Sequence, residues 1–461
     1  MIALMVAGTA SGVGKTTIAL ALMAALRERG YRVQPFKCGP DFLDAGHHSA
    51  ICGRVSRNLD TWMLDGAANR AIFATASRDA DAAIVEGMMG LYDGVAGGGE
   101  DGSAAQIAKL LGLPVVLVLD AGKSARSIAA VVKGFESFDP EVRFAGIVLN
   151  RVGSDRHYCL LETAIRSVTT TPLLGHLPTD PTLAIPDRHL GLHTTEETTS
   201  AKSRLAAFAQ AGRQFLDLAP LLGLAWKNAV TESEAASSIL FQEESHVRIG
   251  VAQDKAFSFY YEDNFDQLQE SGAEIVPFSP LSDTNFPANL DGLYLGGWYP
   301  ELHADALSRN ASMCAGILAL AEAGKPVYAE CGGMIYLGKS LAMLDGRSYP
   351  MTGLLPMEFE MTPRLVHFGY VDVEFIEDCL LGGKGTKVRG HSFHCSRLRA
   401  GSTMSPAYRL KYSLSGREEL EGYQFKNLLA SYVHLHFRAN PILARSLVGA
   451  ARRAQDAGVQ V

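Results

Sequence analysis

The sequence lacks several features, and each absence excludes a class of protein. None of its 461 residues falls in an apolar run near the ~20 residues that a membrane helix needs. The apolar run at 2–6 has no basic segment before it, so we expect a strand there and not a signal peptide. Cysteine is sparse and odd in number, at seven, which argues against a disulfide framework. We therefore expect a cytoplasmic protein without a membrane partner.

Positive charge is not in excess either. The chain has 42 Lys and Arg against 49 Asp and Glu, a net charge of −7, which argues against nucleic acid as the main partner. The length predicts two or three domains. A polar, acidic stretch near 225–246 is the best boundary, so we predict domains at 1–195 and 246–461, joined by a helix and linker at 196–245.

Short continuous apolar runs alternate with helical stretches through most of the chain. In the first half the runs are 2–6, 33–37, 82–87, 113–120, 144–150 and 173–178. A second series comprises 247–252, 274–278, 292–295 and 326–329. This alternation is typical of parallel sheets covered on both faces. We predict an α/β protein with two doubly wound domains, in which ligands lie beyond the carboxyl ends of the strands.

A glycine-rich segment follows the first predicted strand and precedes a predicted helix at 18–29. Glycines let backbone N–H groups converge on a phosphate, and the helix N-terminus adds its positive dipole end. A lysine and a hydroxyl then serve the phosphates and Mg²⁺. The residues expected to bind ATP here are Gly12, Gly14, Lys15, Thr16 and Thr17. The first glycine of the segment is Gly8, one residue earlier than the usual spacing.

Polar residues at the ends of other strands could complete this site. Mg²⁺ prefers hard oxygen ligands, so we assign it to Thr16, Asp41 and Glu86. Lys37 could neutralise charge during phosphoryl transfer, and the amide of Asn150 could contact the nucleotide base. The alternatives are that Glu86 is a plain strand-terminating acid and that Lys37 is a solvated lysine.

The segment 39–60 is polar and resembles a substrate-recognition loop. Adjacent residues rarely point the same way, which argues against a metal held by the paired histidines of this segment. The planar fork of an arginine suits a substrate carboxylate because it bonds both oxygens. A second loop, with a glycine run at 97–99, is expected at the same edge. The predicted substrate-binding residues are His47, His48, Arg54, Arg57, Asn58 and Tyr92.

The second half contains a candidate nucleophile. Cys331 follows a predicted strand and precedes an apolar run, which is the pattern of a nucleophile on a sharp strand-to-helix turn. His434, distant in sequence, could serve as its base. We assign the oxyanion or glutamine contacts to Gly296, Gly297 and Gly332.

These motifs resemble known families. The cysteine turn, the glycine turn and the late histidine are similar to class I glutamine amidotransferase domains. They are closest to the branch used in cobalamin synthesis, which lacks the usual third acid; here His436 stands two residues after His434. The first half resembles dethiobiotin-synthetase-like P-loop enzymes, including their shifted first glycine. With segments 34–41, 46–48 and 56–60, the whole chain is similar to the cobyrinic acid a,c-diamide synthase family.

The resemblance implies amidation of two carboxylates on a corrin precursor, with ATP and glutamine as substrates and Mg²⁺ as cofactor. Cys331 would attack the glutamine amide, with His434 as base and then acid. The first half would form an acyl phosphate for ammonia arriving by an internal path. Rival substrates are hydrogenobyrinic acid and nickel-sirohydrochlorin. Other classes are a partitioning-type ATPase switch with a degenerate binding module and a cysteine hydrolase unrelated to glutamine. We expect a monomer or homodimer.

Overall fold

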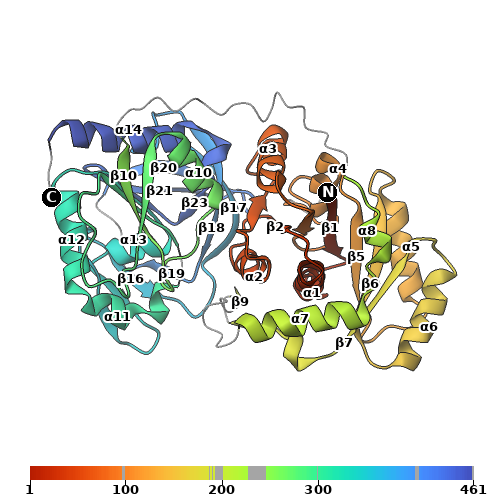
Figure 1. Ribbon diagram of the computed structural model, residues 1–461. Coiled ribbons are helices and arrows are strands. Elements are labelled where there is room, and N and C mark those ends of the chain that lie inside the picture. Colours follow the sequence, from red (N-terminus) through yellow and green to blue (C-terminus); the bar gives the residue numbers. More distant parts are fainter. Residues whose placement is uncertain are drawn as a thin grey trace. The chain divides into compact units, whose positions relative to one another are not determined.

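The computed structural model describes residues 1–95, 99–185, 187–188, 191–192, 201–226, 246–297, 299–399 and 404–458. The chain divides into two compact units, Met1–Ser237 and Ser238–Val461, each of which is described by itself (Figure 1). Of the predicted helix and linker at 196–245, the structure describes 201–226, and Gly97 and Gly98 of the second predicted loop lie outside the described residues.

A seven-stranded parallel sheet forms the centre of the first unit, in the order β3-β2-β4-β1-β5-β6-β7. β1 and β4 are buried along their whole length, which explains why they read as unbroken apolar runs. The strands predicted for the first half are all present. Their bounds are β1 (Ile2–Gly8), β2 (Val33–Cys38), β3 (Arg57–Leu59), β4 (Ala82–Glu86), β5 (Val115–Asp120), β6 (Phe144–Val152) and β7 (Leu173–Pro178).

Helices α1 and α7 pack together on one face of this sheet (Figure 1). A Cβ atom on Gly212 of α7 would lie 2.5 Å from the carbonyl oxygen of Ala21, so the close approach of the helices needs glycine there. The helix predicted near 203–222 is two helices, α7 and α8. The bounds are α1 (Lys15–Glu28), α2 (Leu43–Cys52), α3 (Gly66–Ser77), α4 (Ala104–Leu111), α5 (Ile128–Phe138), α6 (Asp155–Arg166), η1 (Pro181–Leu183), β8 (Asp187–Arg188), β9 (Gly191–Leu192), α7 (Ala201–Phe215) and α8 (Ala219–Leu222).

The second unit contains a ten-stranded mixed sheet. Five neighbouring strands, β11-β10-β12-β13-β22, run parallel, and β21-β20-β17-β18-β23 continue the sheet with antiparallel pairs. The doubly wound prediction therefore describes the parallel half only. The bounds are β10 (Val247–Ala252), β11 (Ala273–Phe278), β12 (Gly292–Leu295), β13 (Val327–Glu330), β17 (His367–Phe375), β18 (Lys387–His394), β20 (Pro406–Tyr412), β21 (Glu418–Phe425), β22 (Leu428–Ser431) and β23 (Val433–Leu435).

Helices and a small second sheet complete this unit. The small sheet has the order β15-β14-β16-β19. The remaining bounds are α10 (Glu262–Glu270), η3 (Pro300–Leu302), α11 (Ala304–Arg309), α12 (Ala311–Glu322), α13 (Gly332–Leu337), β14 (Ser340–Ala342), β15 (Ser348–Pro350), β16 (Glu358–Met361), β19 (Ser396–Leu398), η4 (Phe437–Ala439) and α14 (Ile442–Asp456).

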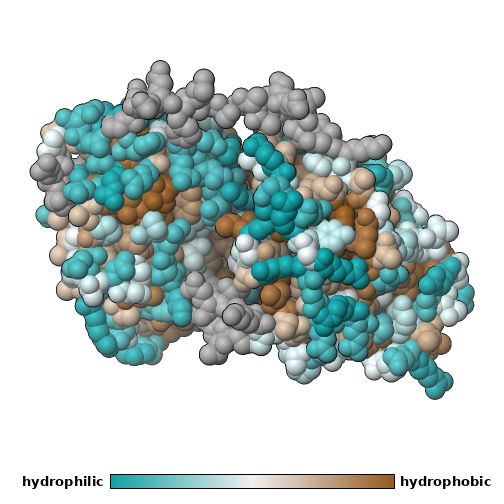
Figure 2. All heavy atoms as spheres, in the orientation of Figure 1, coloured by the Kyte–Doolittle hydropathy of each residue, from teal (hydrophilic) through white to brown (hydrophobic). Residues whose placement is uncertain are grey.

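The surface of each unit mixes hydrophilic and hydrophobic residues on the face shown in Figure 2. Within the described ranges, none of the helices combines the length and the apolar character that crossing a membrane requires.

Candidate active sites

The predicted phosphate loop joins β1 to α1, and close approaches require two of its glycines, Gly8 and Gly14. Gly14 caps α1 in the left-handed region, at φ 97°. A Cβ atom there would lie 1.9 Å from Nδ2 of Asn150, which donates a hydrogen bond to the Val13 carbonyl at 2.9 Å. A Cβ atom on Gly8 would lie 2.5 Å from the Val13 side chain. The absence of a side chain at Gly8 therefore leaves room for the Val13 side chain. Asn150 on β6 holds the loop through its hydrogen bond to the Val13 carbonyl.

Lys15 begins α1 and folds back over the loop. Its ammonium donates a hydrogen bond to the Ala10 carbonyl at 3.0 Å. Burial and the nearby Lys37 charge lower the pKa of Lys15. An anion bound in the loop would stabilise both charges, which is the electrostatic setting of a phosphate site.

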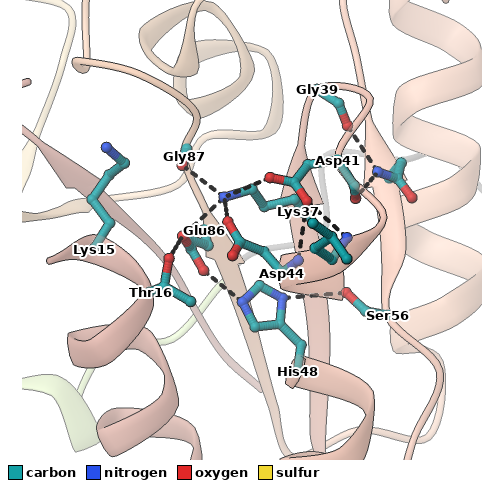
Figure 3. Close-up of polar contacts among 12 residues, drawn as sticks. Lys15, Thr16, Lys37, Gly39, Asp41, Asp44, His48, Ser56, Glu86 and Gly87 are labelled. Atoms are coloured by element: carbon teal, nitrogen blue, oxygen red, sulfur yellow. Dashed lines mark hydrogen bonds and ion pairs between the residues drawn. The ribbon is translucent and has the colours of Figure 1, made fainter. Parts of the chain in front are cut away.

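Glu86, at the end of β4, links three predicted site residues (Figure 3). Its Oε1 accepts hydrogen bonds from Thr16 at 2.8 Å and from Lys37 at 2.9 Å. Its Oε2 lies 2.6 Å from Nε2 of His48. Burial would raise the pKa of Glu86, but Lys37 and His48 outweigh it and lower that pKa. The structure therefore joins the end of β4 to α1, β2 and α2 through one buried carboxylate.

Lys37 lies among carboxylates at the end of β2. Its ammonium is bonded to Asp44 and Glu86, and Oδ2 of Asp41 is 4.0 Å away. Burial would lower the pKa of Lys37, but Asp44 and Glu86 outweigh that effect and raise it well above its usual range. Lys37 is thus a cation at the edge of the sheet where parallel α/β sheets bind ligands.

Asp44 is a site residue that the sequence analysis missed. Oδ1 of Asp41 accepts the backbone N–H groups of Leu43 and Asp44, at 2.9 and 3.0 Å, and so caps the start of α2. This turn places the Asp44 side chain against Lys37, and Oδ1 of Asp44 is buried without a hydrogen-bond partner among the described residues. The available signal was its place in the first turn of a helix, three residues after Asp41.

The oxygen atoms around Lys37 fit a nucleotide-associated Mg²⁺. Within the described ranges, no three His, Cys, Asp or Glu side chains form a cluster that would hold a metal by itself. Mg²⁺ bound with a nucleotide does not need one, because it takes one or two carboxylates and completes its shell with phosphate oxygens and water. The Thr16–Glu86 pair and the orphaned oxygen of Asp44 supply donors of that type.

The predicted substrate loop contributes two residues to the organisation of this site. His48 contacts Glu86, as described above. Asn58, opposite Lys37 in the β2–β3 register, donates hydrogen bonds to the carbonyls of Gly39 and Asp41 at 2.8 and 3.0 Å. His47 is buried on α2, and its Nε2 has no hydrogen-bond partner among the described residues. Burial lowers the pKa of His47 to about 4.

The other predicted substrate residues are engaged elsewhere in the fold. Arg54 pairs with Asp79 at 2.7 Å. The Tyr92 hydroxyl donates to the Phe135 carbonyl at 2.7 Å. Arg57 lies half-buried on β3. These contacts give Arg54 and Tyr92 a structural role in the fold. The substrate-binding roles of Arg54, Arg57 and Tyr92 remain predictions.

In the second unit, Cys331 lies on a strained turn between β13 and α13. Its backbone has φ 47° and ψ −106°, a conformation that costs a non-glycine residue about 1–3 kcal/mol. A hydrogen bond from its N–H to the Ser431 carbonyl, at 2.7 Å, holds the turn. Backbone strain of this kind is typical of nucleophiles presented above a sheet.

The structure brings His434 to Cys331, as predicted. A Cβ atom on Gly297 would lie 2.4 Å from Cε1 of His434, 3.0 Å from its Nε2 and 3.3 Å from Cβ of Cys331. The two side chains therefore meet over the bare backbone of Gly297. Burial would lower the pKa of His434, but the hydrogen bond with Cys331 and the negative charge of the nearby Glu330 outweigh it and raise the pKa to about 10.

Of the predicted oxyanion residues, two already use their N–H groups. Gly296 donates to the Tyr260 hydroxyl at 2.8 Å, and Gly297 donates to the Phe259 carbonyl at 3.3 Å. Gly332 opens α13, where the first N–H groups have no acceptor within the helix. The geometry favours Gly332 as the donor, and the role of all three remains a prediction. Sequence reasoning also missed Glu330, which contacts His434.

Comparison with known proteins covers both units. Residues 4–192 match the CobQ/CobB/MinD/ParA nucleotide binding domain family, and residues 248–442 match the CobB/CobQ-like glutamine amidotransferase domain family. The chain is 42% identical over 454 residues to a cobyrinate a,c-diamide synthase of Listeria monocytogenes serotype 4b, covering 98% of this chain and 99% of the relative. It is 44% identical over 452 residues to the Syntrophotalea carbinolica protein of that name, covering 97% and 98%. The Salmonella typhimurium protein of that name is 41% identical over 452 residues, covering 98% of each chain.

The match extends over nearly the full length of these relatives, and it includes both the phosphate loop and the Cys331 turn. The chain therefore belongs to the cobyrinate a,c-diamide synthase family, glutamine-hydrolysing ligases in which a nucleotide-binding domain is fused to a glutamine amidotransferase domain.

Proposed function

We propose that this protein converts the a and c carboxylates of cobyrinic acid into amides through acyl phosphate intermediates, with ATP and glutamine as co-substrates. The observation that carries the proposal is the meeting of Cys331 and His434 over Gly297, in a chain whose other unit holds a phosphate loop. A phosphate site and a cysteine–histidine pair on one chain suit a ligase that makes its own ammonia.

The second unit releases ammonia from glutamine. Because its pKa is raised to about 10, His434 holds the proton of the Cys331 thiol, and the thiolate sulfur attacks the side-chain carbonyl carbon of glutamine. The tetrahedral intermediate collapses as the carbon–nitrogen bond breaks and His434 returns the proton to the leaving nitrogen. Water then hydrolyses the thioester, which frees glutamate and restores the thiol. The N–H of Gly332 is suited to hold the oxyanion of both steps.

The first unit activates the substrate carboxylate. The N–H groups of the phosphate loop and Lys15 bind the ATP phosphates, and Lys37 stabilises the charge of the group in transfer. A carboxylate oxygen of the corrinoid attacks the γ-phosphorus, and ADP leaves. Ammonia then attacks the acyl carbon and displaces inorganic phosphate, leaving the amide.

Residues next to Lys37 would hold Mg²⁺ together with the nucleotide. Thr16 and Glu86 are joined by a hydrogen bond, and Asp41 and Asp44 also face the Lys37 ammonium (Figure 3). When bound, Mg²⁺ supplies charge neutralisation for the phosphate oxygens. The protein's own part is to keep these carboxylates fixed through Lys37 and His48.

Mass spectrometry of reaction products tests this function directly. The protein is incubated with ATP, Mg²⁺ and glutamine and, in separate reactions, with cobyrinic acid, hydrogenobyrinic acid or nickel-sirohydrochlorin. We expect cobyrinic acid to lose about one mass unit for each hydroxyl replaced by an amine, at two positions. Amidation of another tetrapyrrole alone would overturn the substrate assignment. ATP hydrolysis that is indifferent to every tetrapyrrole, without any amide product, would favour an ATPase switch.

A further inference from the structure

Glu330 lies directly before the nucleophile and beside its histidine. Its Oε2 is 3.4 Å from Nδ1 of His434, and the carboxylate is buried, with 1% of the residue exposed. Nδ1 is the ring nitrogen opposite the Nε2 that faces Cys331 across Gly297. In cysteine and serine nucleophile systems, an acid at this nitrogen orients the ring and selects its tautomer.

Three donors fix the Glu330 carboxylate in place. Oε1 accepts from the Tyr328 hydroxyl at 2.7 Å and from the Leu435 N–H at 3.1 Å. Oε2 accepts from the Tyr294 hydroxyl at 3.0 Å. Leu435 directly follows His434 on β23, so the same carboxylate is tied to the backbone that carries the imidazole. Because these donors fix the carboxylate, it can in turn fix the orientation of the His434 ring.

The position two residues after His434 does not supply this acid. It is occupied by His436, whose ring packs on Tyr261 with a centroid distance of 4.7 Å. We propose that Glu330 is the positioning residue of the cysteine–histidine pair. The acid then comes from the residue directly before Cys331 and not from the position two residues after His434. The inference rests on the proposed roles of Cys331 and His434.

The titratable groups that face His434 come from two directions. Cys331 and Glu330 lie at the end of β13, and His391 is its register partner across β18. His394 lies further along β18. Burial lowers the pKa of His391 to about 3 and that of His394 to about 4, so both are neutral at working pH. Glu330 is therefore the acid that can balance a positive charge on His434 during the reaction.

The test uses Glu330→Gln in the full chain. This substitution keeps the size of the side chain and an oxygen acceptor but removes the charge. We expect kcat for glutamine hydrolysis to fall about 100-fold or more with KM changed less than about threefold, since a polarised histidine matters most in the transition state. Alkylation of Cys331 by iodoacetamide, followed by peptide mass spectrometry, should shift to higher pH, because the thiolate loses its stabilised partner. ATP-dependent amidation with added ammonia should persist.

Matched variants separate positioning from packing. Tyr328→Phe removes one of the three hydrogen bonds to Glu330 but keeps its charge, so kcat should fall and the alkylation profile should shift by much less than in Glu330→Gln. Glu330→Asp should retain the parent alkylation profile in part, and it serves as the reporter if Glu330→Gln does not fold. An unchanged alkylation profile in Glu330→Gln, or an equal effect of Tyr328→Phe, would overturn the inference. Full glutamine hydrolysis by Cys331→Ala would instead overturn the proposed function.

Discussion

The hydroxyl of Thr16 donates a hydrogen bond to Oε1 of Glu86 at 2.8 Å. This contact joins the first turn of α1, directly after the phosphate loop, to the end of the neighbouring strand β4. The same carboxylate binds Lys37, so the phosphate loop and the cluster of charges around Lys37 form one connected site. A nucleotide phosphate and a substrate carboxylate can therefore be served by adjacent groups.

Removing the charge of Glu86 should disable the ligase reaction but not glutamine hydrolysis. In Glu86→Gln, the buried Lys37 and the half-buried Thr16 keep a neutral partner, and we expect amidation to fall about 100-fold or more with either glutamine or ammonia. Product formation and glutamate release are measured in parallel. Asp79→Asn, which neutralises an exposed ion pair with Arg54, is the charge-matched control and should leave both rates unchanged. Equal activity of the two variants would contradict the assignment.

Alanine at Gly14 should abolish tight nucleotide binding. The left-handed backbone costs about 1–2 kcal/mol for a residue with a Cβ atom, and that atom would collide with Asn150. We expect ATP affinity, measured by calorimetry, to fall more than about tenfold. Gly30→Ala has a similar backbone angle, φ 88°, but open space around its Cβ position. Gly30→Ala should lower the free energy of unfolding without changing the affinity for ATP. A loss of ATP affinity in Gly30→Ala would show that backbone strain alone, and not the contact with Asn150, weakens binding in Gly14→Ala.

Alanine at Gly297 should silence the glutamine site selectively. Its methyl group would lie 2.4 Å from the His434 ring, so the histidine must move away from Cys331. We expect glutamine hydrolysis to fall about 100-fold, because a misplaced base loses its proton-transfer geometry, while ammonia-dependent amidation continues. Gly383→Ala, where the nearest atom is 3.5 Å away in ordinary contact, is the control. Unimpaired glutamine hydrolysis in Gly297→Ala would rule out this arrangement of the pair.

Acid should destabilise the second unit through its buried neutral histidines. Burial lowers the pKa of His391 from 6.5 to about 3 and that of His394 from 6.5 to about 4. Below pH 6.5 the unfolded chain protonates these histidines and the folded unit does not, so their contribution to the free energy of unfolding should fall as pH drops, by up to about 1.4 kcal/mol per pH unit for each histidine. Glu421, whose pKa burial raises to about 7, has the opposite effect over this range, so the loss is assigned by comparison with a histidine variant. Pulse proteolysis in urea at pH 7.5 and 5 measures this loss. His391→Gln should reduce it, and an unchanged pH dependence would refute the assignment.

The parallel strands could be predicted because burial on both faces leaves an unbroken apolar run, as in β1 and β4. The antiparallel half of the second sheet gave no such signal. Its strand β17 mixes buried and exposed residues and alternates them only over 371–375, and its partners β18 and β20 are set by the register of pairing. Pairing of that kind is decided by tertiary packing and not by local composition.

The site residues divide in the same way. The sequence could point to Lys15, Lys37 and Glu86 as candidates because Lys37 and Glu86 lie at the ends of β2 and β4, and Lys15 begins the helix after β1. Asp44 and Glu330 were missed because their importance comes from what they touch, Lys37 and His434, and not from a motif of their own. The fold pairs residues that are far apart in the sequence, and only the assembled sheet shows which acids face which bases.

We propose that the second unit makes ammonia and the first unit uses it, and a comparison of one variant in each unit distinguishes these roles. Amidation of cobyrinic acid is measured for Cys331→Ala and Lys15→Ala, with glutamine and with ammonium as nitrogen source. We expect Cys331→Ala to lose glutamine-driven amidation and to keep the ammonia-driven reaction, whereas Lys15→Ala should lose both. Equal loss of both reactions in Cys331→Ala, or ammonia-driven amidation surviving in Lys15→Ala, would contradict this proposal.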